Sequence, residues 1–204
     1  MSLSTRIRST AIAAITATAL AIGLTGCGTP PWLDGSSPSA STKPSPSPSA
    51  SIQTIKNDLA SGSTKRTLAA GSIALSVDYW SDLAMNKWTA TANKPLSVSL
   101  TAALAPDDGQ QVYLSKVSAV VAVTKGTKAL PAPAPISDQA TISPGYLIKT
   151  PYSYTYTFVL PALDPRATSV TVDLVYELLL QSTPTSSQYA KQTATDTITI
   201  AIAH

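Results

Sequence analysis

The chain has very little of the chemistry that enzymes use. Its 204 residues include one histidine, one cysteine and one glutamate, Glu177. The histidine is His204, so a Ser-His-Asp or Cys-His arrangement is not expected inside a folded domain. Zinc and type 1 copper sites also depend on histidine and cysteine ligands. The sequence therefore predicts a protein that is not an enzyme and that holds no metal or other cofactor.

Charge is scarce as well. Charged residues make up 12% of the chain, against ~25% in typical globular domains. Beyond the pair Lys65-Arg66 there is no basic cluster, and a nucleic-acid-binding surface needs a basic stripe. The sequence therefore predicts no nucleic-acid partner and a surface made largely of Ser, Thr, Ala and Gln.

Residues 1–26 have the organisation of a secretion signal. Arg6 and Arg8 precede an uncharged run at 11–24, which is shorter than the ~20 apolar residues of a membrane-spanning helix. The run ends at Leu24-Thr25-Gly26-Cys27, and Cys27 is the only cysteine. This tetrapeptide resembles the lipobox of bacterial lipoproteins.

The resemblance implies that the chain is cleaved before Cys27 and that a diacylglycerol is attached to the Cys27 thiol. Acyl chains stabilise membrane attachment by ~0.8 kcal/mol per buried CH₂. The expected location is the cell membrane, with the protein facing the extracytoplasmic side. The alternative is an ordinary secretion signal followed by a chance cysteine.

Residues 27–52 contain the lipidated cysteine and a Ser/Pro-rich stretch with almost nothing to bury. Such a composition cannot offset the entropy of ordering, so we expect a disordered tether. A Ser/Thr/Pro spacer after the cysteine is similar to that of lipoproteins from Gram-positive envelopes. In general plan the whole chain resembles the immunoglobulin-like lipoproteins of those bacteria, a likeness that assigns no active-site residues.

Residues 53–204 have the pattern of one domain built from strands. Apolar and polar residues alternate over 73–79, 96–104, 152–160, 170–180 and 198–202. This two-residue period is typical of antiparallel strands with one buried face. Within 112–123 the apolar parity changes near Ser115-Lys116, which predicts a β-bulge.

Two short strands, at 88–92 and 146–149, bring the expected total to about seven or eight. Turn residues such as Asp107-Asp108-Gly109 and Pro144-Gly145 separate the strands. The predicted fold is all-β, an antiparallel β-sandwich with immunoglobulin-like topology. A small closed barrel is the alternative.

Aromatic residues gather around one connection of this domain. Tyr79, Trp80 and Trp88 bracket residues 81–87, which include Asp82. Strand parity places Tyr79 inward and Trp80 outward or at an edge. A flat ring beside amide and carboxylate groups suits a saccharide, so Trp80, Trp88 and Asp82 are candidate ligand-binding residues. The competing interpretation is that both tryptophans pack in the core or at its rim.

Three functions are compatible with these features. The first, which we predict, is a lipid-anchored, non-catalytic interaction module that binds another envelope protein through a sheet face or loops. The alternative is a lipoprotein that binds cell-wall polysaccharide through Trp80 and Trp88. The third, an enzyme accessory or divergent hydrolase, is disfavoured by the shortage of histidine and glutamate.

Overall fold

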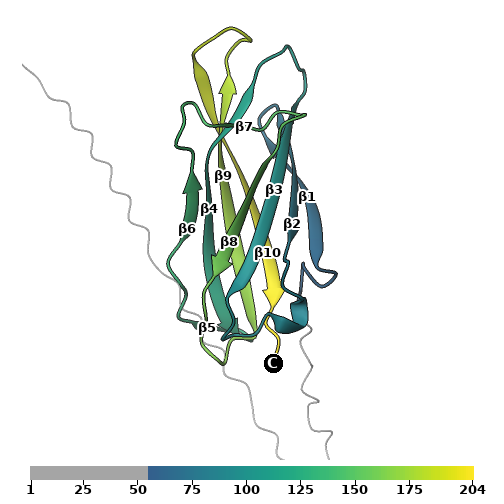
Figure 1. Cartoon of the computed structure of the whole chain (residues 1–204), viewed down its shortest axis with the longest axis vertical. Coiled ribbons are helices and arrows are strands. Elements are labelled where there is room, and N and C mark those ends of the chain that lie inside the picture. The colour runs from purple at the N-terminus through teal and green to yellow at the C-terminus, as the bar shows by residue number, and fades with distance from the viewer. Residues whose placement is uncertain (1–54) are drawn as a thin grey trace, which may run out of the picture. The chain divides into compact units, whose positions relative to one another are not determined.

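The computed structural model describes residues 55–204, so the predicted signal peptide, Cys27 and the whole of the predicted tether lie outside the described residues. Ten strands form two antiparallel sheets (Figure 1). In the four-stranded sheet the order is β1 (Ser63–Ala70), β2 (Ile73–Trp80), β3 (Lys94–Leu104) and β8 (Tyr154–Leu160).

The six-stranded sheet has the order β10 (Tyr189–Ala201), β9 (Ser169–Gln181) and β4 (Val112–Lys125). Three short strands pair with the remaining side of β4: β5 (Lys128–Leu130), β6 (Ile136–Gln139) and β7 (Tyr146–Leu147). A single 3₁₀ turn, η1 (Met85–Lys87), lies between β2 and β3. Over residues 55–204, no helix has the length and apolar character needed to cross a membrane.

The predicted antiparallel β-sandwich is confirmed, as two separate sheets rather than one closed sheet. The neighbours β2-β3-β8 and β4-β9-β10 reproduce the A-B-E and C-F-G orders of immunoglobulin-type sandwiches. Strand β1 extends the first of these sheets by one edge strand. The predicted bulge is also confirmed, because the register between β4 and β9 shifts between Leu114 and Lys116.

Two details of the strand prediction were wrong. Residues 88–92 form a turn instead of a strand, with only an isolated bridge between Thr89 and Ala203. The prediction also missed β1, the short strands β5 and β6, and the first half of β10. Of these, β1 and the first half of β10 are edge segments whose inward positions carry few large apolar residues, so they lack the alternation that marked the other strands.

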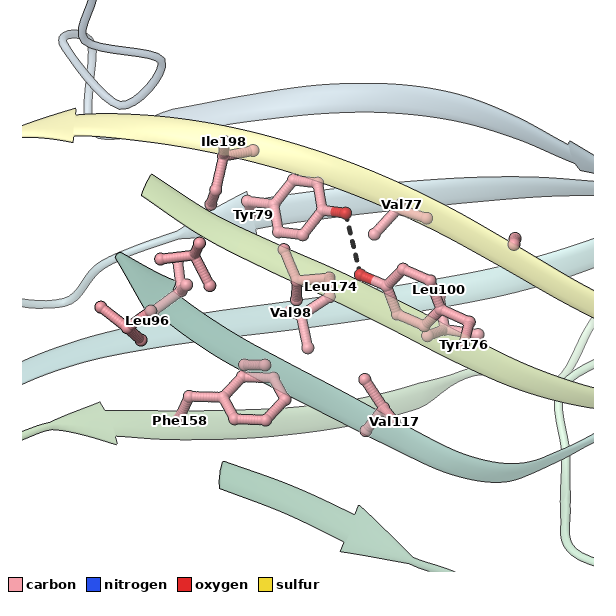
Figure 2. Close-up of a cluster of buried hydrophobic side chains, with 14 of the residues drawn as sticks. Val77, Tyr79, Leu96, Val98, Leu100, Val117, Phe158, Leu174, Tyr176 and Ile198 are labelled. Carbon is pink, nitrogen blue, oxygen red and sulfur yellow. Dashed lines mark hydrogen bonds between the residues drawn. The ribbon is translucent and has the colours of Figure 1, made fainter. Parts of the chain in front are cut away.

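The core lies between the sheets. Figure 2 shows Leu96 and Val98 of β3 facing Leu174 of β9, with Phe158 of β8 beside them. Tyr79 is fully buried, which confirms its inward parity. Its hydroxyl lies 2.8 Å from that of Tyr176 on the opposite sheet, so these two buried hydroxyls are partners for each other.

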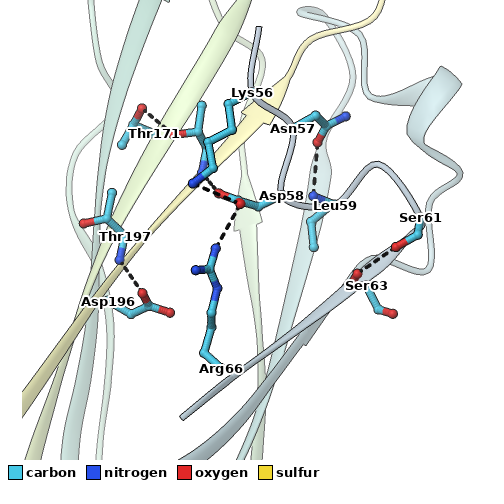
Figure 3. Close-up of polar contacts among 11 residues, drawn as sticks. Lys56, Asn57, Asp58, Leu59, Ser61, Ser63, Arg66, Thr171, Asp196 and Thr197 are labelled. Atoms are coloured by element: carbon cyan, nitrogen blue, oxygen red, sulfur yellow. Dashed lines mark hydrogen bonds and ion pairs between the residues drawn. The ribbon is translucent and has the colours of Figure 1, made fainter. Parts of the chain in front are cut away.

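The described chain begins and ends at the same end of the sandwich, which we call the base (Figure 1). Here Asp58 is joined to the last strand: its N–H donates to the Thr199 carbonyl at 2.7 Å, and its Oδ2 accepts the Thr199 N–H at 2.8 Å. Figure 3 shows Arg66 and Lys56 approaching the same carboxylate, at 2.9 and 3.2 Å. These contacts connect the segment before β1 to β10 of the other sheet.

Lys94 is the most unusual residue of the base, because it is a lysine with 0% exposure. Its ammonium donates to four backbone carbonyls, those of Thr89, Ala90, Ala92 and Pro161, at 2.6 to 3.3 Å. Burial lowers the pKa of Lys94 below its ordinary value. The lysine thus ties the turn at 89–92 to the loop that follows β8.

Candidate functional site

Trp88 does not lie where a saccharide platform would need it. Its side chain is 0% exposed, and its Nε1–H donates to the Ser81 hydroxyl at 2.8 Å. That hydroxyl in turn donates to the Pro95 carbonyl at 2.6 Å. Trp88 follows the η1 turn, and its ring lies in the core, where it contributes a large apolar area. The prediction of Trp88 as a ligand-binding residue is therefore corrected: it is a core residue.

Trp80 is at the outer face of the four-stranded sheet, as its parity predicted, and is half-buried. Its cross-strand neighbours are Ser63 on β1 and Ser97 on β3. Asp82 is exposed, and no hydrogen bond or ion pair of the described residues joins it to either tryptophan. Of the two tryptophans that were predicted to form the site, only Trp80 lies at this face.

Hydroxyl groups surround Trp80 on the same face. Ser97 and Thr157 are hydrogen-bonded across β3 and β8 at 2.8 Å, and Thr155 donates to Ser99 at 3.0 Å. We call this surface the hydroxyl face; its members are Ser63, Thr67, Ser76, Trp80, Ser97, Ser99, Thr101, Thr155 and Thr157. Its charged groups form one exposed ion pair, Lys65 with Asp78. The result is a flat, nearly neutral surface of hydroxyls around one indole ring.

The outer face of the six-stranded sheet is different, because large apolar side chains lie on it. Leu179, Tyr113 and Leu147 are directly opposite one another on β9, β4 and β7. Tyr189 of β10 packs edge-on against Tyr113, with ring centroids 5.8 Å apart. We call these four residues the apolar row. All four are half-buried, and none belongs to the core cluster or packs against it.

Charged groups border the apolar row on one side. Lys191, opposite Leu179 on β10, forms an ion pair of 2.5 Å with Glu177. Lys116 lies opposite Glu177 on β4. An apolar centre with a charged, solvent-accessible border is the usual anatomy of a protein–protein contact surface.

The apolar row was not predicted, although its signal is present in the sequence. Val112 and Leu114 mark the inward parity of β4, so Tyr113 between them must point outward. In the same way Leu179 lies between the inward positions of Leu178 and Leu180. A large apolar residue on the outward parity of a strand is the feature that identifies such a surface.

Two tyrosines of the interior have pKa values raised by burial. Burial, followed by the neighbouring Tyr176 hydroxyl, raises the pKa of Tyr79 far above its ordinary value. Burial likewise raises the pKa of Tyr154, whose hydroxyl donates to Asp138 Oδ2 at 2.6 Å. Neither phenol therefore ionises near neutral pH: Tyr154 donates to Asp138, and the Tyr79 hydroxyl shares a hydrogen bond with that of Tyr176.

The row of tyrosines at 152, 154 and 156 divides between core and surface. Tyr154 is buried and Tyr156 half-buried, while Tyr152 is 57% exposed and precedes β8. Tyr154 stacks on Tyr146 of β7, with ring centroids 5.2 Å apart. Tyr154 and Tyr156 thus pack against other aromatic rings along the side of the sandwich.

A pocket of about 230 Å³ opens at the base. It is lined by Thr89, Ala90, Thr91, Pro165, Ala203 and His204, and it contains neither Trp80 nor Asp82. Among residues 55–204, no three His, Cys, Asp or Glu side chains come together as a metal site would require. Within the described part of the chain, the surfaces best suited to a ligand are the hydroxyl face and the apolar row.

Comparison of the chain with protein-family models and with curated proteins found no match in either case.

Proposed function

We propose that this protein is a lipid-anchored, extracytoplasmic module without catalytic activity that binds another envelope protein through the apolar row. The observation that carries the proposal is the row itself: Tyr113, Leu147 and Leu179 adjacent on three strands, with Tyr189 packed against Tyr113. Tyrosine is enriched at protein interfaces, and half-buried apolar side chains outside the core gain from being covered.

The position of the row supports a docking role for an anchored protein. Lys191, which is in line with the row, and Thr199, which binds Asp58 at the base, are eight positions apart on β10. At ~3.4 Å per residue, the row lies about 27 Å along the strand from the base. The described chain begins at the base, so the row lies at the other end of the sandwich from the point where the preceding residues join it.

The anchor and the row require separate tests. Cys27→Ala is expected to release the protein from the membrane fraction, and unchanged fractionation would contradict lipidation. For the row, a photo-crosslinking residue placed at Tyr113 in the native protein is expected to capture one envelope protein in stoichiometric amount. The same residue placed at Ser76, on the opposite sheet, is the matched control.

The captured protein is then purified for a direct binding measurement. Leu179→Lys places an unpaired charge in the row and is expected to weaken binding by about tenfold or more, as loss of a central interface residue does. Ser76→Lys on the hydroxyl face is expected to leave the affinity unchanged. Equal affinities for both variants would overturn the assignment to the apolar row.

A second candidate function, binding of wall glycan, is favoured by the half-exposed Trp80 among the hydroxyls of Ser63, Ser97 and Thr157. An indole ring stacks on the apolar face of a sugar while hydroxyls bind its rim. Purified wall glycan is expected to change the tryptophan fluorescence of the protein, and Trp80→Phe to remove the change. A signal that persists in Trp80→Phe would count against this site.

A further inference from the structure

The two sheets end in four open edges, and two of them are protected by charge. Strand β1 carries Lys65 and Arg66. Strand β10 carries Lys191, and two of its amides are capped by carboxylates: Asp58 accepts the Thr199 N–H, and Asp196 accepts that of Thr197 at 2.8 Å. Charged side chains and capped amides are the usual means of keeping an edge strand from pairing with another chain.

The edge beside β4 is protected in another way. Its strands β5, β6 and β7 have only three, four and two residues. Three prolines, Pro131, Pro133 and Pro135, stand between β5 and β6. Short strands and prolines offer no continuous row of amides to a partner strand.

Strand β8 has none of these protections. Its seven residues, Tyr154–Leu160, include no charged residue, proline or glycine. Among the described residues, no hydrogen bond reaches its backbone except those of the ladder with β3. Strand β6 comes near it, where the Tyr154 side chain reaches Asp138. An uncharged edge of this length, rich in aromatic and β-branched residues, is a template for another strand.

We propose that β8 pairs with β8 of a second copy of this chain, antiparallel and about a two-fold axis at Thr157. This pairing joins the two four-stranded sheets into one continuous eight-stranded sheet. The interface is isologous, so the same surface is buried on both copies.

The side chains of β8 are complementary to themselves in this register. On the inner side Tyr156 meets Phe158 of the second copy, and Tyr154 meets Leu160. On the outer side Thr155 meets Val159, which is 53% exposed in the single chain, and Thr157 meets its own equivalent. Aromatic and β-branched cross-strand pairs of this kind stabilise antiparallel sheets, and no like charges oppose each other.

Tyr156 supports this choice of partner. It is half-buried between two buried neighbours on the inner row, Tyr154 and Phe158. Its ring lies edge-on to Phe158, with centroids 4.9 Å apart. A second β8 would cover the flank of Tyr156 that the single sandwich leaves open.

The length of the tether permits this arrangement on one membrane. Antiparallel pairing turns one copy end for end, so the two bases point in opposite directions. The 13 residues of β10 extend ~44 Å. The predicted tether, residues 27–52, would span roughly 80 Å when fully extended at ~3.1 Å per residue. The inverted copy therefore remains within reach of the same surface.

A disulfide at the two-fold axis tests the pairing directly. In full-length protein carrying Cys27→Ala, Thr157→Cys introduces the only cysteine. Residues directly opposite in an antiparallel pair have Cα atoms ~4.5–5.5 Å apart, within the range of a disulfide. We expect mild oxidation to yield a disulfide-linked dimer. Ser76→Cys on the central strand β2 is the matched control and is expected to remain monomeric.

Sedimentation equilibrium of the Cys27→Ala protein tests the same contact without a crosslink. Thr157→Lys places two like charges opposite each other and is expected to weaken dimerisation by about tenfold or more. Ser76→Lys is expected to leave it unchanged. A protein that stays monomeric at high concentration, or a dimer that Thr157→Lys does not weaken, would overturn the proposal. A dimer abolished by Leu179→Lys instead would also overturn it, since the contact would then be the apolar row.

Discussion

The base of the sandwich and its two outer faces use similar side chains in opposite ways. At the base, the Lys94 ammonium has four carbonyl partners, and the Trp88 indole N–H is bonded to Ser81 inside the core. On the faces, the rings of Trp80 and Tyr113 are half-exposed. Polar and aromatic groups at the base are buried and hold the chain together, whereas those on the faces keep part of their surface exposed, where a partner can contact them.

The two tryptophans provide the strongest test of this comparison. Trp88→Ala removes a fully buried ring and is expected to lower the free energy of unfolding by about 3–5 kcal/mol. Trp80→Ala removes a half-buried ring from the outer face, and we expect a loss of only about 1 kcal/mol. Urea denaturation of both variants measures the difference. Equal losses would show that Trp80 is as important to the fold as Trp88.

Lys94 tests whether the buried charge of the base is structural. Lys94→Met keeps most of the side-chain volume but removes the donor of four carbonyl bonds. We expect a loss of about 3 kcal/mol, because unpaired buried carbonyls retain their desolvation cost. Lys116→Met, on the outer face of β4, is the control and is expected to change stability by less than about 0.5 kcal/mol. Similar midpoints of unfolding for the two variants would refute a structural role for Lys94.

Asp58 is expected to make the stability of the base depend on pH. Burial alone would raise the pKa of its carboxyl group, but the Thr199 amide together with Lys56 and Arg66 outweighs burial and lowers it below the ordinary value. The carboxylate therefore stabilises the fold above about pH 4, and this contribution is lost as the pH falls through the lowered pKa.

Asp58→Asn is the corresponding variant. It is expected to be less stable than the natural protein at neutral pH by about 1–2 kcal/mol, since Arg66 loses its charged partner. The difference in melting temperature between the two proteins should shrink below pH 4. A difference that stays constant from pH 7 to pH 2 would mean that the Asp58 charge does not stabilise the base. Asp173→Asn, exposed on β9, serves as the control.

The sequence predicted the fold well wherever strands had one buried face. The alternation over residues 73–79 and 170–180 reappears as β2 and β9, and the parity change in β4 became the observed bulge. Edge segments such as β1 were missed, because they bury too little to show the pattern.

The candidate site was predicted less well, for a different reason. Parity placed Trp80 correctly on the outside, because that residue ends a regular strand. Trp88 follows a 3₁₀ turn, where the two-residue period no longer applies, so its burial could not be derived from spacing. Nothing in the sequence around Lys94 distinguishes it from an exposed lysine, because its four partners are backbone carbonyls of two separate segments.

By itself the sequence determined the fold class, because period-two alternation is a local property that one strand carries alone. The prediction of a lipid anchor at Cys27 also comes from the sequence alone, because a lipobox is a short motif that is recognised without any folded domain. Only the tertiary structure decided which surfaces remain for a partner. The apolar row, the hydroxyl face and the open edge of β8 each depend on how separate strands pair. Strand parity marks a single outward residue such as Tyr113, but it does not say which residues of other strands lie beside it.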